Sequence, residues 1–280
     1  MAETTTLTFG SPATSITLVC SPSLPAPPLS GVPGGSGDAT GQLLWPGARA
    51  LCRTLLAFCP EVRGAVCVEL GCGSGAVSAV AAALCGAALV VATDGAPAAL
   101  PLAAATLASN AVPPSSGAVA LLPWGAENVA PLVERHLGGR RCRVVLAAEA
   151  VYPASSDAAI DALLATALAL LDSADPDACF LMSYVPRAPQ ATQRLCDAAW
   201  RGGWAWEALG TAAPRGEGEA GAVVLRLTVA PRPPRAGGAW AEGAAAMMDA
   251  AFPGARESAR AAQEYAEEAA EERRVWGLLP

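Results

Sequence analysis

The sequence predicts an α/β fold: a doubly wound, seven-stranded sheet that is mostly parallel and ends in an antiparallel hairpin. From residue 65 onward, short apolar runs typical of buried strands alternate with longer helical patterns, which predicts a parallel sheet with helices on both faces. The last two strand-like runs, 204–209 and 222–229, have no helix between them, so they pair most simply as an antiparallel hairpin.

Each predicted strand is a short run of apolar residues bounded by Gly, Pro or polar residues. The runs before the final pair cover residues 65–70, 89–93, 118–122, 143–148 and 179–184. Helices are predicted at 45–58, 75–84, 97–109 and 189–200, and from a cap at Ser155 or Ser156 to residue 171. No element is predicted between residues 122 and 143, where the basic residues from Arg135 to Arg143 indicate a solvated loop.

The composition of the chain changes twice along its length, which predicts three parts. Residues 1–41 contain two β-like runs, 5–9 and 15–20, that predict a small hairpin, followed by a flexible loop rich in Pro, Gly and Ser. Residues 42–230 are predicted to form the α/β domain. Residues 231–280 begin with a Pro-rich stretch and continue with patterns that predict a helical extension.

Composition and charge argue against several classes of function. The formal net charge is −7 and all 18 basic residues are arginine, so nucleic acid is not expected as a partner. The apolar run 76–93 contains a turn and lies between Glu69 and Asp94, which favours a buried helix and strand over a membrane span. No metal site is expected, because the nine cysteines are scattered and there is one histidine. Reduced thiols in the cytoplasm or nucleus fit this pattern best.

The most informative motif is a glycine-rich turn between the first predicted strand of the sheet and the helix that follows it. Gly71, Gly73 and Gly75 alternate with other residues directly after the strand. Glycine permits a tight turn and the close approach of a ligand, and the helix start offers free N–H groups. Dinucleotides favour the spacing Gly-x-Gly-x-x-Gly, and S-adenosylmethionine sites use a similar turn. A tight turn that binds no ligand is the third possibility.

Two acidic residues help to separate these possibilities. Glu69 lies at the end of the strand, where it would repel a pyrophosphate but suits the positively charged ammonium and sulfonium groups of S-adenosylmethionine. Asp94 ends the next strand, where either cofactor class places an acid that accepts hydrogen bonds from ribose hydroxyls. Glu69 therefore favours S-adenosylmethionine over NAD, whereas Asp94 indicates a nucleoside without choosing between the two cofactors.

Further motifs make the chain similar to a known family. Over roughly residues 42–229 it resembles the Rossmann-like, seven-strand S-adenosylmethionine-dependent methyltransferases, and specifically the methyltransferase-like group that modifies lysines of non-histone proteins. The matching segments, in the order typical of that group, are Leu44-Trp45-Pro46-Gly47-Ala48 with Leu51, Val68 to Gly75, Ala92-Thr93-Asp94, Asn110, Pro123-Trp124-Gly125 and Ala148-Glu149-Ala150-Val151-Tyr152.

The resemblance implies a role for each matching residue. The implied cofactor-binding residues are Trp45, Glu69, Gly71 and Gly73 at the methionine part, Asp94 at the ribose, Trp124 against the adenine and Ala148 close to the adenosine. Glu149 and Tyr152 are the implied catalytic residues, with Tyr152 facing the transferred methyl group. For Trp45 and Trp124 the alternative is packing in the core.

Glu149 departs from the family pattern, which usually has aspartate at this place. A glutamate at this position makes the chain similar to the histidine-methylating members of the family. A lysine ammonium, with an unperturbed pKa of ~10.4, must lose a proton before it can accept a methyl group. Glu149 could orient that amine and help to remove the proton. Alternatively, it caps the helix that follows.

The expected function is therefore transfer of a methyl group from S-adenosylmethionine to a lysine side chain of a non-histone protein. The alternatives are a histidine acceptor, a small-molecule acceptor and a non-catalytic module that binds S-adenosylmethionine. A nicotinamide dehydrogenase fits less well, because it would need a catalytic acid–base pair and His136 is the only histidine.

Overall fold

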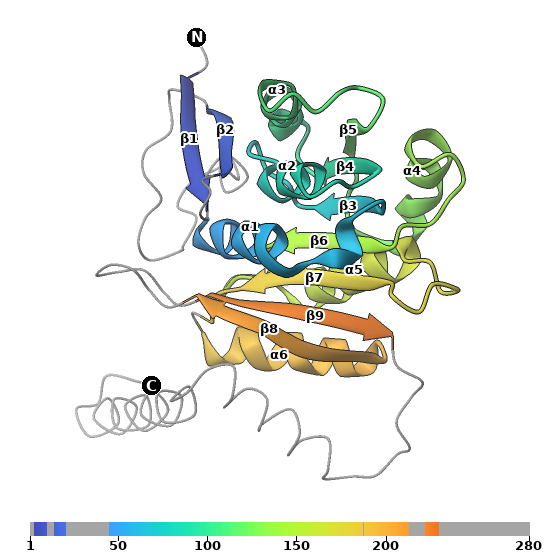
Figure 1. The fold of residues 1–280 in the computed structure, drawn as a ribbon. Coiled ribbons are helices and arrows are strands. Elements are labelled where there is room, and N and C mark those ends of the chain that lie inside the picture. The colour runs from blue at the N-terminus through green and yellow to red at the C-terminus, as the bar shows by residue number, and fades with distance from the viewer. Residues whose placement is uncertain (1–2, 10–13, 21–44, 187, 213–221, 230–280) are drawn as a thin grey trace, which may run out of the picture. The chain divides into compact units, whose positions relative to one another are not determined.

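The computed structural model describes residues 3–9, 14–20, 45–186, 188–212 and 222–229, and its centre is a seven-stranded sheet with the order β5-β4-β3-β6-β7-β9-β8 (Figure 1). The strands are β3 (Val66–Leu70), β4 (Leu89–Asp94), β5 (Gly117–Leu121), β6 (Val144–Ala148), β7 (Cys179–Tyr184), β8 (Trp204–Ala212) and β9 (Ala222–Val229). Strands β3 to β7 are parallel, and β9 is antiparallel to both of its neighbours. The predicted fold class is therefore confirmed.

The strand order creates a crevice beside β3. The chain leaves β3 in one direction, through β4 to β5, and then returns to place β6 on the other side of β3. In open α/β sheets, ligands bind at such a reversal, beyond the carboxyl ends of the strands. The central strands are apolar throughout because both of their faces are covered, and Val68, Leu146 and Leu181 are fully buried.

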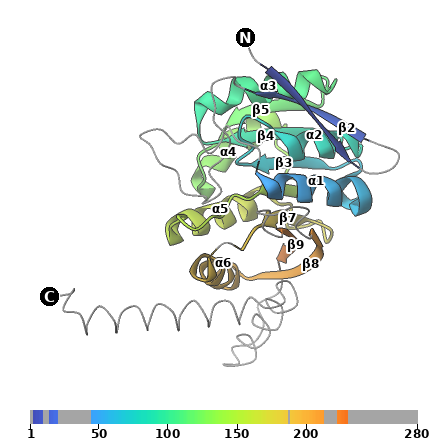
Figure 2. The same cartoon turned by 90° about the vertical axis from the view of Figure 1, so that its left-hand side faces the viewer.

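Helices cover both faces of the sheet. The α-helices are α1 (Pro46–Phe58), α2 (Val77–Leu84), α3 (Leu100–Ser109), α4 (Val129–His136), α5 (Asp157–Leu170) and α6 (Pro189–Arg201), and the short 3-10 helices are η2 (Pro60–Val62), η3 (Pro97–Ala99) and η4 (Ala126–Asn128). In Figure 2, α1 and α2 lie on one face, and α4, α5 and α6 lie on the other. None of the helices in the described ranges is long and apolar enough to cross a membrane.

The starts of the helices follow local sequence rules. Ser156 caps α5 by accepting a hydrogen bond from the Ala159 N–H at 3.2 Å, which confirms the second of the two predicted caps. Proline occupies the first turn of α1 and of α6, where its missing N–H costs nothing. Helix α2 begins only at Val77, two residues later than predicted, because Ala76 adopts a left-handed conformation with φ 41°.

The prediction of a loop around Arg135 and His136 was wrong, because both residues belong to α4. Val129, Leu132 and Val133 are buried on one side of this helix, at the spacing of an amphipathic helix. The helix has only eight residues, so its pattern is too short to stand out from the turn residues before it. Its basic last turn complements the negative end of the helix dipole.

The predicted N-terminal hairpin is present. Strands β1 (Glu3–Phe9) and β2 (Thr14–Cys20) pair antiparallel, and Leu7, Ile16 and Leu18 are buried. The hairpin is tied to the end of α3 by Asn110, which accepts a hydrogen bond from Thr17 N–H at 2.8 Å and donates one to Thr17 O at 2.6 Å. The predicted loop at 21–41 and the predicted helical extension at 231–280 lie outside the described residues.

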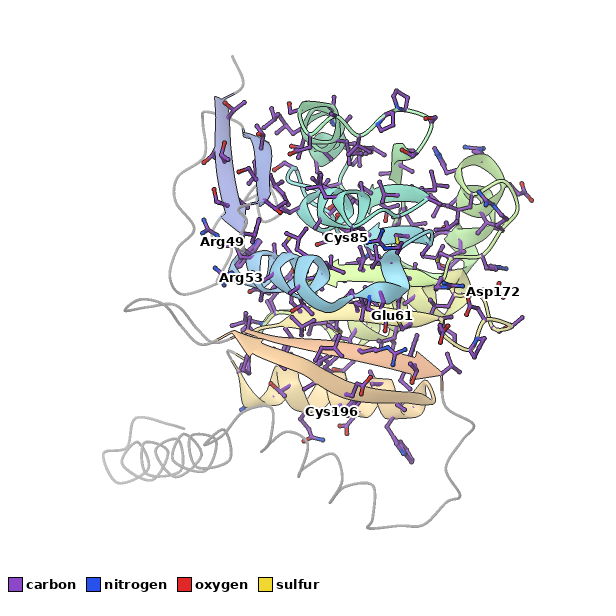
Figure 3. The ribbon with its side chains drawn as sticks, in the orientation of Figure 1. Arg49, Arg53, Glu61, Cys85, Asp172 and Cys196 are labelled. Atoms are coloured by element: carbon purple, nitrogen blue, oxygen red, sulfur yellow. The ribbon has the colours of Figure 1, made fainter. Side chains whose placement is uncertain are left out.

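The cysteines in the described part of the chain are free thiols spread over separate elements. Cys85 at the end of α2 and Cys196 on α6 lie far apart (Figure 3). Burial raises the pKa of Cys59 to about 12 and the pKa of Cys196 to about 11, so these thiols stay protonated and poorly reactive at neutral pH.

The Asn110 contacts predict that the hairpin depends on an amide at this position. In Asn110→Asp, an oxygen can still accept from Thr17 N–H, but the amide donor that contacts the carbonyl oxygens of Thr17 and Thr106 is replaced by a second acceptor. We expect the free energy of unfolding, measured in denaturant, to fall by ~1–3 kcal/mol. The matched control is Asn128→Asp, which removes an exposed hydrogen bond to Pro123 O and should cost less than ~0.5 kcal/mol. Equal losses in the two variants would contradict this role of Asn110.

Candidate active site

A cavity of about 630 Å³ lies at the carboxyl ends of β3, β4 and β6. It is large enough for a ligand the size of a nucleoside with a short chain. All of the residues predicted from the sequence to bind cofactor or to act in catalysis line it: Trp45, Glu69, Gly71, Gly73, Asp94, Trp124, Ala148, Glu149 and Tyr152. The structure therefore brings these residues together, and their individual roles stay predictions.

The glycine-rich turn forms one wall of the cavity. Gly71 has a φ of 67°, a conformation that L side chains rarely adopt, and a Cβ at this position would lie 3.3 Å from Cζ2 of Trp124. The Trp124 indole thus lies against the bare backbone of the turn. The turn is also fixed from behind, because Cys72 N–H donates to Thr93 O at 2.8 Å.

Asp94 connects this turn to the next strand. One carboxylate oxygen accepts a hydrogen bond from Gly73 N–H and the other accepts one from Ala96 N–H, both at 2.8 Å. Each oxygen has a second lone pair, so the carboxylate can still accept hydrogen bonds from a ligand in the cavity. The residue therefore has a structural function in addition to the predicted ribose contact.

Glu69 also contacts the backbone of its own domain. Its carboxylate accepts hydrogen bonds from Ala79 N–H at 2.9 Å and from Ser78 N–H at 3.3 Å, at the start of α2. Burial raises the pKa of Glu69 to about 7, although these hydrogen bonds oppose the shift. The side chain thus caps α2 while it lines the cavity, a function that the sequence argument had not included.

Glu149 lies at the end of β6 in a strained backbone conformation, with a φ of 50°. Its carboxylate accepts a hydrogen bond from Gly47 N–H in the first turn of α1. A Cβ at position 47 would lie 2.7 Å from Cγ of Glu149 and 2.8 Å from Oγ of Ser183, so only glycine fits there. The alternative that Glu149 caps the following helix is wrong, because Ser156 caps α5 and the partner of Glu149 is α1.

Tyr152 lies in a closed turn between β6 and α5. Its N–H donates to Oγ of Ser155 at 3.0 Å, and Ser155 N–H donates back to Tyr152 O at 2.9 Å. Tyr152 is half-buried and lines the cavity together with Ala154, Ser155 and Ser156. This turn and Glu149, which follow β6, form a second wall of the cavity.

The sequence did not predict that the N-terminal hairpin lines the cavity. Leu18 and Val19 of β2 line it, and Val19 N–H donates to Oγ1 of Thr106 on α3 at 3.0 Å. No local pattern in residues 14–20 distinguishes a strand that walls a cavity from one that only packs on a helix. One signal in the sequence pointed to Gly47: it belongs to the first matching motif, two residues after Trp45. Nothing in that motif indicates that its partner is Glu149.

The electrostatic character of the cavity is acidic. Glu69, Asp94 and Glu149 are buried carboxylic acids, with 3%, 9% and 7% of their surface exposed. None of the described residues that line the cavity is Lys, Arg or His. A positively charged ligand is therefore favoured over an anionic one.

The raised pKa of Glu69 predicts how stability depends on pH. Between the ordinary value of 4.5 and the folded-state value of about 7, the folded protein binds a proton at Glu69 that the unfolded chain does not. The free energy of unfolding should therefore fall as pH rises through this window, by up to ~3 kcal/mol from this group. Glu69→Gln should remove this part of the slope when unfolding is measured at several pH values. Glu134→Gln, at an exposed position of α4, is the control, and an unchanged slope in Glu69→Gln would contradict the assignment.

Comparison with known proteins identifies the fold and the family. A family profile described as lysine methyltransferase matches residues 34–195, more than half of the chain. No curated protein sequence matches the chain. The solved structures with a similar fold include a protein assigned as a methyltransferase and complexed with SAH, with a TM-score of 0.51, 13% identity and coverage of 76% of this chain and 53% of that chain. A protein from Streptococcus mutans assigned as a SAM-dependent methyltransferase has a TM-score of 0.50, 13% identity and the same coverage.

The chain thus spans about half the length of these two structures. The site fits S-adenosylmethionine, because the glycine-rich turn leaves room for a ligand and the buried carboxylic acids suit its ammonium and sulfonium groups. The chain belongs to the lysine methyltransferase family, and it shares the fold of these two solved structures.

Proposed function

We propose that the protein transfers a methyl group from S-adenosylmethionine to the amine of a lysine side chain in another protein. The observation that carries the proposal is the charge of the cavity, where Glu69, Asp94 and Glu149 are buried and no described lining residue is basic. Such a cavity favours a cationic acceptor and disfavours the phosphates of a nucleic acid. The match to the lysine methyltransferase family profile supports the same acceptor.

The cofactor would be held along the wall formed by the glycine-rich turn. Asp94 would accept hydrogen bonds from the ribose hydroxyls, and the Trp124 indole would cover the adenine. Gly71 and Gly73 would lie against the methionine part, with Trp45 and Glu69 close by, and Ala148 would lie against the adenosine. When bound, the cofactor supplies an electrophilic methyl group on a positively charged sulfur.

The acceptor would enter from the side of Glu149 and Tyr152. A lysine arrives as an ammonium ion and must lose one proton, so that the nitrogen lone pair is free to form the new bond. Glu149 would hold the ammonium by charge and accept that proton or pass it to water, while Tyr152 would limit the orientation of the amine. The hydrogen bond from Gly47 holds the Glu149 carboxylate, and the closed Tyr152–Ser155 turn holds the backbone that carries Tyr152. Both would lower the entropy lost on reaching an in-line geometry.

The first test identifies the acceptor. The purified protein is incubated with isotopically methyl-labelled S-adenosylmethionine and a proteome extract, and labelled residues are identified by mass spectrometry. We expect the label on lysine. Because the chain contains no lysine and one histidine, a labelled lysine must come from another protein and self-methylation cannot mimic the result. Label confined to histidine, to RNA or to a small molecule would overturn the proposed acceptor and leave the family assignment intact.

The second test concerns Glu149. Glu149→Gln keeps an oxygen that can accept the hydrogen bond from Gly47 N–H, so the fold and the affinity for S-adenosylmethionine should change little. It loses the charge and the ability to take up a proton, so turnover on the labelled acceptor should fall by ~10²–10⁴-fold. Wild-type turnover in Glu149→Gln would remove Glu149 from the catalytic residues.

The pH dependence of the reaction gives a third test. The single-turnover rate of the wild type on a lysine acceptor should keep rising above neutral pH, as the fraction of free amine increases.

A further inference from the structure

The structure points to Arg194 of α6 as a positioning residue for the acceptor side of the cavity. The inference rests on the proposed function, because it assigns acceptor binding to the wall that contains Glu149 and Tyr152. Arg194 does not line the cavity itself, and neither its position in the sequence nor the family motifs drew attention to it. We infer that its guanidinium holds the backbone turn on which Tyr152 is carried.

The turn from Tyr152 to Ser155 is short and its inner hydrogen bonds are made by its own residues. Tyr152 N–H donates to Ser155 Oγ, and Ser155 N–H donates to Tyr152 O. These bonds fix the shape of the turn, but they do not attach it to the rest of the domain. Its placement relative to the cavity therefore depends on contacts from outside.

Arg194 supplies such a contact from a different element. Its Nη2 donates to Pro153 O at 3.1 Å and to Ser155 O at 3.0 Å, so that one nitrogen spans the turn. Its Nε forms an ion pair with Asp157 Oδ1 at 3.3 Å, in the first turn of α5. The guanidinium on α6 is thus hydrogen-bonded to the turn through Nη2 and ion-paired with the exposed Asp157 at the start of α5 through Nε. A lysine ammonium has a single nitrogen and cannot make both contacts with the same geometry.

The helix that carries Arg194 is itself anchored near the carboxyl end of β7. The hydroxyl groups of Tyr184 and Thr192 lie 2.7 Å apart in a buried hydrogen bond. Tyr184 is the last residue of β7, and Ser183 before it accepts the hydrogen bond from Glu149 N–H at 3.0 Å. The same strand end therefore fixes the backbone of Glu149 directly and the turn of Tyr152 through α6 and Arg194.

The chain offers a matched control on the same helix. Arg201 of α6 forms an ion pair with Asp161 of α5 at 2.8 Å, with about half of both side chains exposed. It links the same two helices as Arg194 and has the same charge, but its hydrogen bond and ion pair are both to Asp161 and not to the Tyr152–Ser155 turn. Arg201→Ala therefore measures the effect of removing an arginine between α5 and α6 while the contacts of the turn stay intact.

The experiment compares Arg194→Ala, Arg194→Lys and Arg201→Ala in the full chain. Amide hydrogen exchange of a peptide that covers residues 150–156 measures how firmly the turn is held, and calorimetry measures the affinity for S-adenosylmethionine. We expect faster exchange only in the Arg194 variants and an affinity within ~3-fold of the wild type. For the acceptor identified with labelled cofactor, kcat/KM should fall by ~10–100-fold in Arg194→Ala and by less in Arg194→Lys, because a small displacement of a positioning group has effects of this size.

Several outcomes would overturn the inference. Unchanged exchange in the Arg194 variants would show that the turn does not depend on this residue. Equal losses of turnover in Arg194→Ala and Arg201→Ala, or a loss of cofactor affinity as large as the loss of turnover, would indicate a general structural role. If the acceptor is not lysine, the proposed function fails, but exchange and turnover on the acceptor found still test Arg194.

Discussion

The close approach of helix α1 to the end of β6 is the constraint on which the site depends. Gly47 leaves no space for a side chain between α1, Glu149 and Ser183, and its N–H group is bonded to the Glu149 carboxylate. Any larger residue would push the first turn of α1 away from the sheet, and Trp45 and Ala48 of the cavity wall would move with it. One contact therefore fixes both the carboxylate at the strand end and the start of the helix whose residue Ala48 lines the cavity.

The three buried carboxylic acids of the site follow a common rule. Each accepts hydrogen bonds from backbone N–H groups: Glu69 at the start of α2, Asp94 at the glycine-rich turn and Glu149 at the start of α1. Backbone N–H groups stabilise a carboxylate without adding a positive charge. An arginine or lysine partner would instead neutralise the pair. No described residue of the cavity lining supplies a positive charge that would offset these acids, while burial raises the pKa of Glu69 to about 7 and leaves this one acid partly protonated at neutral pH.

The sequence predicted the sheet and the cluster of site residues because both depend on local signals. Strands such as 179–184 are apolar runs with clear ends, and the residues that meet in the cavity follow strand ends or belong to short motifs. Three features could not be predicted, for different physical reasons. Helix α4 is too short to show a strong period, the partner of the Glu149 carboxylate lies on an element about a hundred residues away, and the hairpin reaches the cavity only through tertiary packing.

The contribution of β2 to the cavity has a thermodynamic consequence for the domain. Leu18 and Val19 lie in the cavity wall, while the strand is held in place by Thr106 and Asn110 on α3. If the bound cofactor contacts this wall, then docking of the hairpin and binding of the cofactor are linked equilibria that share one coupling free energy. Each process then strengthens the other by the same factor, so the affinity for the cofactor depends on the fraction of molecules in which β2 is docked.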